Sequence, residues 1–131
     1  MTETLKNEIN FYKELAEEIK PDGFKSFLYA ENGTAWMYVI TPGNSWLYID
    51  HAEWGGFNIS FEYKPSAGCG SGCRCNDNPL FEITAATLLD AEKYGKNFRW
   101  NNCGHMCKPT LYTDAMKAMK NSYFSEKLIE L

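Results

Sequence analysis

The chain has 131 residues, a net charge of −4 and 44% apolar residues, values that suit one folded domain spanning 1–131. Residues 1–63 carry 4 basic against 10 acidic side chains, whereas residues 64–131 carry 9 against 7. An acidic protein repels phosphate, which argues against general nucleic-acid binding. The acidic first half is either a solvated face or a surface that meets a basic protein partner.

The first ten residues, "MTETLKNEIN", lack the basic and apolar regions of a secretory signal. The apolar runs of the chain are too short to span a bilayer, so no membrane association is expected. We therefore expect a cytoplasmic protein whose cysteines stay reduced.

Residues 3–19 are predicted to form a helix. Their apolar side chains recur every three or four positions and form one stripe, made by Leu5, Ile9, Tyr12, Leu15 and Ile19. The following "KPDG", residues 20–23, ends the helix, because proline cannot continue it and glycine permits the exit turn.

Strands are predicted at 24–30, 34–40, 45–50 and 57–64. Asn32-Gly33 joins the first two, since this pair favours the tight turn of a hairpin. In the fourth strand Phe57, Ile59 and Phe61 alternate with polar residues, which predicts one buried face and one wet face.

Two short helices are expected in the second half of the chain, after an extended stretch at 81–83. Thr84 would cap a helix over 85–95 with Leu88 and Leu89 facing inward, and Thr113 would cap a second helix over 114–120. The pattern of residues 123–131 favours no one structure.

These elements predict an α+β fold. It consists of an N-terminal helix, an antiparallel meander of four to five strands, and two short C-terminal helices packed on one sheet face. The other face would then present aromatic side chains to a protein partner, and the candidates are Trp36, Tyr38, Trp46, Tyr48 and Trp54.

Two cysteine-rich clusters, "GCGSGCRC" at 68–75 and "CGHMC" at 103–107, suggest a structural zinc site. The candidate ligands are Cys69, Cys73, Cys75, Cys103, His105 and Cys107. Zinc would be the one cofactor, although neither cluster has the usual C-x2-C spacing.

Three alternatives remain open at the cysteines: small core residues, a disulfide in an oxidising compartment, or an enzyme with an activated thiol. The sequence also places Asp50, His51 and Glu53 together at a strand end, where a metal or acid–base role competes with a simple wet turn.

The stretch from 55 to 84 resembles small phage and prophage proteins of unknown function. The likeness lies in a Gly-Phe-x-Ile-Ser strand, a Lys-Pro step and a Gly-x-Gly turn, carried here by Gly56, Phe57, Ile59, Ser60, Lys64, Pro65, Gly70 and Gly72. It implies an accessory protein of a mobile element, a class that often binds and blocks a host enzyme. The leading hypothesis is therefore a non-catalytic binding protein, with a zinc module and a thiol enzyme as alternatives.

Overall fold

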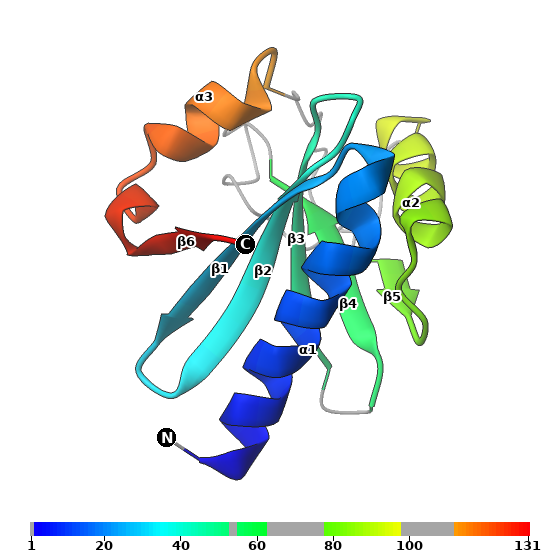
Figure 1. The fold of residues 1–131 in the computed structure, drawn as a ribbon. Helices are drawn as coiled ribbons and strands as arrows, with labels where there is room; N and C mark the ends of the chain where they lie inside the picture. The colour runs from blue at the N-terminus through cyan, green and yellow to red at the C-terminus, as the bar shows by residue number, and fades with distance from the viewer. Residues whose placement is uncertain (1, 53–54, 63–77, 98–111) are drawn as a thin grey trace, which may run out of the picture.

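The computed structural model describes residues 2–52, 55–62, 78–97 and 112–131, and Figure 1 shows their arrangement. The helices are α1 (Glu3–Ile19), α2 (Ala85–Asn97) and α3 (Ala115–Lys120), with short 3-10 helices at Lys20–Asp22 and Ser125–Lys127. The strands are β1 (Lys25–Glu31), β2 (Thr34–Ile40), β3 (Trp46–His51), β4 (Phe57–Phe61), β5 (Asn78–Leu80) and β6 (Leu128–Glu130). They form one antiparallel sheet in the order β5-β4-β3-β2-β1-β6. The predicted α+β class and antiparallel meander are confirmed.

Helix α1 has the predicted boundaries. The hydroxyl of Thr2 accepts a hydrogen bond from the amide of Leu5 at 3.2 Å and so caps the first turn. The predicted apolar stripe is buried along the whole helix. The chain leaves through Gly23, whose φ of +90° is a left-handed conformation that glycine adopts without strain.

The β1–β2 hairpin turns at Asn32 and Gly33, with φ of +54° and +79° respectively, as the sequence predicts. This turn sets the register of the two strands and places Leu28 opposite Met37 and Tyr29 opposite Trp36. The first pair faces one side of the sheet and the second pair faces the other.

Both faces of the sheet are covered, which differs from the expected arrangement. Helices α1 and α2 pack on one face, over a core that includes Met37, Leu47 and Ile49. Helix α3 packs on the opposite face, where Ala115 and Met119 contact the aromatic side chains of β2 and β3. The C-terminal helices therefore do not share a face. The polar side of β4 is only partly wet, since Ser60 is 2% exposed whereas Asn58 is half-buried.

The two later helices also refine the predictions. Thr84 caps α2 as expected, because its Oγ1 accepts from the amide of Thr87 at 3.1 Å. Leu88 is buried but Leu89 is 42% exposed, because adjacent helical positions lie about 100° apart and cannot both face one sheet. Helix α3 is capped by Asp114 rather than by Thr113, through a 3.1 Å bond from the amide of Lys117.

Candidate functional site

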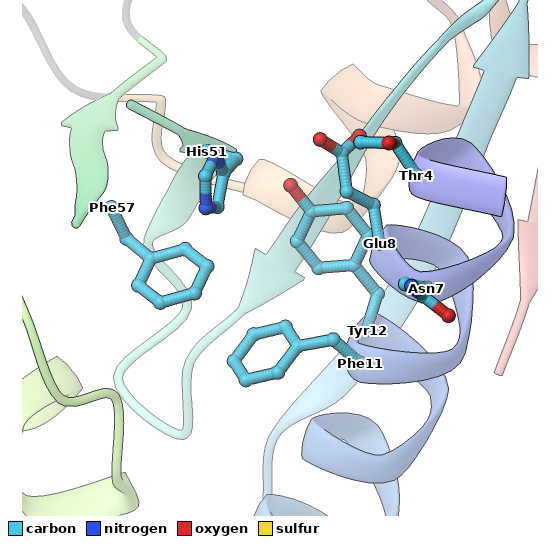
Figure 2. A pocket seen from close by; sticks show the side chains of 7 residues that line it. All are labelled: Thr4, Asn7, Glu8, Phe11, Tyr12, His51 and Phe57. Atoms are coloured by element: carbon cyan, nitrogen blue, oxygen red, sulfur yellow. The ribbon is translucent and has the colours of Figure 1, made fainter. Parts of the chain in front are cut away.

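A pocket of about 280 Å³ lies between the first half of α1 and the facing ends of β3 and β4 (Figure 2). Its lining residues are Thr4, Asn7, Glu8, Phe11, Tyr12, His51 and Phe57. The helix supplies five of them at spacings of three and four along α1, and the two strands supply His51 and Phe57, which are opposite each other in the β3–β4 register.

Aromatic rings form one wall of this pocket. The ring of Phe11 stacks on that of Phe57, with centroids 4.7 Å apart and an interplanar angle of 13°. The imidazole of His51 meets Phe57 edge-on, at 5.4 Å and 87°. Phe57 of β4 thus contacts both Phe11 of α1 and His51 of β3, and these ring contacts hold the wall in place.

The hydroxyl of Tyr12 is the most unusual polar group of the pocket. Tyr12 is 1% exposed, and its hydroxyl makes no hydrogen bond of normal geometry with any described residue. The His51 backbone lies near enough to lower the hydroxyl's pKa slightly. That effect is outweighed by burial first and by the Glu8 carboxylate second, so the pKa of Tyr12 is raised above its usual 10.0. The phenol therefore stays neutral and can both donate and accept a hydrogen bond.

Glu8 gives the pocket its electrostatic character. It is the one Asp, Glu, Lys or Arg side chain among the seven lining residues. In Figure 2 its carboxylate lies with Thr4 at the same side of the opening as the Tyr12 hydroxyl, and the rings of Phe11 and Phe57 lie at the other side. The arrangement combines a carboxylate, a buried phenol and an aromatic wall, which suits a planar, hydrogen-bond-donating group.

The aromatic residues predicted to bind a partner lie mostly on the opposite face, towards α3. Tyr38 and Trp46 are 5% and 4% exposed and belong to the core beneath that helix. Trp36 and Tyr48 are half-buried, and Trp36 stacks on Tyr29 at 4.2 Å. Trp54 lies outside the described residues. Among the four members of the predicted set that the structure describes, Trp36 and Tyr48 are the ones that stay partly exposed.

All six candidate zinc ligands lie outside the described residues: Cys69, Cys73, Cys75, Cys103, His105 and Cys107. Within the part of the chain that the structure describes, no group of three or more His, Cys, Asp or Glu residues could hold a metal ion. The zinc site, the core-thiol and disulfide alternatives and the thiol enzyme remain predictions.

The predicted polar cluster at the end of β3 is separated by the strand itself. Asp50 and His51 are consecutive, so their side chains lie on opposite faces of the sheet. Asp50 accepts a hydrogen bond from the Tyr48 hydroxyl at 3.3 Å on the α3 side, whereas His51 lines the pocket on the α1 side. Glu53 lies outside the described residues.

Sequence reasoning missed the pocket because its parts are about 40 residues apart in the chain. Two signals were nevertheless present. Tyr12 stands in an otherwise aliphatic stripe, and a buried tyrosine hydroxyl usually needs a partner. Phe11 lies just outside the stripe, where a large ring must find another surface to pack on.

Comparison with known proteins gives no relative: no family model, no curated protein and no solved structure matches the chain. Among the helices that the structure describes, none has the length and apolar character needed to cross a lipid bilayer.

Proposed function

We propose that this chain is a non-catalytic binding protein that recognises a basic surface of a protein partner. The contact surface is the side of α1 that borders the pocket. The proposal keeps the predicted partner chemistry but moves the binding site from the aromatic sheet face to α1, because α3 covers much of that face.

One observation carries the proposal: a continuous row of side chains along α1 leads from the pocket to two exposed carboxylates. Helical spacing puts Thr4, Asn7 and Phe11 in line with Glu14 and Glu18. Both glutamates are exposed. Acidic groups beside an aromatic pocket suit a partner that presents basic side chains, because charge complementarity steers encounter and fixes orientation.

From the resemblance that the sequence of residues 55–84 suggests to small phage and prophage proteins, we propose a more specific role. A mobile-element protein of this size can act by occupying the working surface of a host enzyme, including a defence enzyme. Such an inhibitor acts stoichiometrically and needs no turnover.

Affinity capture from a host lysate tests the proposal when charge variants are included. We compare the natural chain with the double variant Glu14→Lys and Glu18→Lys, and with Asp90→Lys and Glu126→Lys as a control. All four substituted positions are exposed, and each pair changes the net charge by the same amount. We expect a protein that the natural chain and the control capture, that the Glu14/Glu18 variant loses, and that elutes as salt rises.

The captured protein is then purified and titrated calorimetrically. A 1:1 complex without chemical change of either component supports the proposal. Capture of nothing above background, or equal capture by both double variants, overturns it.

A further inference from the structure

We infer that the pocket between α1 and the ends of β3 and β4 accepts the guanidinium group of an arginine side chain supplied by the partner. This inference rests on the proposed function and names the group that the pocket recognises.

The size of the pocket is sufficient for one long side chain. Its volume of about 280 Å³ is just below the range of about 300–1,000 Å³ that is typical of small-molecule and cofactor pockets. The pocket is open to the molecular surface, and Thr4 and Asn7 of its lining are exposed, so a side chain on another protein can enter it.

The aromatic wall favours a flat cation. Phe11, Phe57 and His51 present ring surfaces to one side of the space, as Figure 2 shows. A guanidinium is planar, delocalised and weakly hydrated, so it stacks on such rings at less cost than a compact ammonium does.

The polar groups need hydrogen-bond donors. The Glu8 carboxylate can only accept, and the Tyr12 hydroxyl is buried without a partner among the described residues. A guanidinium has five N–H donors and no acceptor, so it can donate to the Glu8 carboxylate with N–H groups to spare for the Tyr12 hydroxyl, which lies beneath the pocket surface and is reached only if the wall shifts. An apolar occupant would leave both oxygens desolvated, and an anion would be repelled by Glu8.

Titration of the full chain with N-acetyl-arginine amide, followed by ¹H–¹⁵N NMR, tests this inference without the partner. The controls are the citrulline analogue, which is a neutral isostere, and N-acetyl-lysine amide. We expect saturable shifts of amides in residues 7–12 and at His51 and Phe57 with arginine, weaker binding of lysine and no saturable binding of citrulline.

Variants separate recognition from folding. Glu8→Gln should weaken binding of the arginine probe about tenfold or more, because a charged hydrogen bond is lost. Tyr12→Phe should weaken it by a smaller factor, whereas Asp90→Asn, an exposed change on α2, should leave it unaltered.

Absence of saturable shifts up to 50 mM probe (on the order of the weakest useful affinity for one side chain), or equal binding of citrulline, overturns the inference. The two proposals fail separately. If the natural chain binds the arginine probe but captures no protein, the proposed function fails. If the Glu8→Gln variant no longer binds the probe but still captures the partner, only the guanidinium pocket fails.

Discussion

At the scale of single residues, Tyr12 combines a large buried ring with a hydroxyl that has no partner among the described residues. A buried polar group without a hydrogen bond costs free energy, so a protein keeps such a group where another molecule satisfies it or where the ring itself is needed for packing. The ring of Tyr12 fills the core between α1 and the sheet, so packing explains the residue even though its hydroxyl is buried.

We predict that Tyr12→Phe raises the free energy of unfolding, by up to about 1 kcal/mol, because the ring stays and the unsatisfied hydroxyl is removed. Urea unfolding measures the change. The matched control is Tyr48→Phe, which removes a hydroxyl that donates to Asp50 and should be neutral or destabilising. A loss of stability in Tyr12→Phe larger than in the control would show that the Tyr12 hydroxyl has a partner in the folded protein.

A second residue-scale feature is the cluster of Glu31, Lys127 and Tyr29. The Lys127 ammonium and then the Tyr29 hydroxyl donate to the Glu31 carboxylate and lower its pKa below the usual 4.5. The same bond to Glu31 raises the pKa of Lys127 above 10.5. For both side chains, the charged form is favoured in the folded protein relative to the unfolded chain.

The sign of the pH dependence follows from these directions. The Glu31 contribution to stability is fully present above its unfolded pKa and is lost as the pH falls through its lower folded pKa. The Lys127 contribution is fully present below its unfolded pKa and is lost as the pH rises through its higher folded pKa. We predict that Glu31→Gln lowers stability between about pH 5 and pH 10 and matches the natural chain in acid. Denaturant midpoints across pH measure this, and a pH-independent difference would contradict it.

At the scale of elements, α3 depends on the sheet for its existence. It has six residues, too few to be stable as an isolated helix, and its buried side chains are Ala115 and Met119. Met119 is fully buried against the aromatic side chains of β2 and β3. Its side chain therefore holds the helix on the sheet.

We predict that Met119→Ala destabilises the protein by about 2–4 kcal/mol, through the lost apolar contacts and the cavity left behind. The half-buried Met116→Ala should cost clearly less. Thermal unfolding compares the two, and an equal cost would mean that α3 is not anchored through Met119.

The elements also show how far the sequence predicts this fold. The boundaries of α1 and the β1–β2 turn follow from local signals: the apolar stripe, "KPDG" and Asn32-Gly33. The position of α3 does not follow from local signals, because the sequence of this six-residue helix does not show which face of the sheet the helix covers. The run "TAWMYVI" in β2 is apolar on both sides, and this typical sign of a doubly covered strand would have favoured α3 on the second face. The pocket needs α1 docked on the sheet before its parts meet, so no local pattern contains it.

At the scale of the whole molecule, one sheet separates two cores. The first lies under α1 and α2 and the second under α3, and β1, β2 and β3 each contribute side chains to both. Because both cores are built on the same sheet, disruption of the sheet would expose both cores to water. We therefore expect the two cores to unfold together.

We predict coincident unfolding transitions by far-UV circular dichroism and by tryptophan fluorescence. The first follows helices and strands on both faces, and the second includes Trp36 and Trp46, which lie on the α3 face. Equal midpoints and slopes in urea confirm a single transition. A fluorescence change that precedes the loss of secondary structure would show that α3 and its core unfold alone.

The alternation of β3 restricts where this chain can change length. Insertion of one residue in the middle of β3, after Leu47, would turn Tyr48 towards α1 and Ile49 towards α3 while Trp46 and Leu47 kept their faces, which disrupts both cores at once. Insertions should therefore be tolerated better at the exposed hairpin tip, where a Cβ on Gly33 would meet no atom within 4 Å, than inside the central strands.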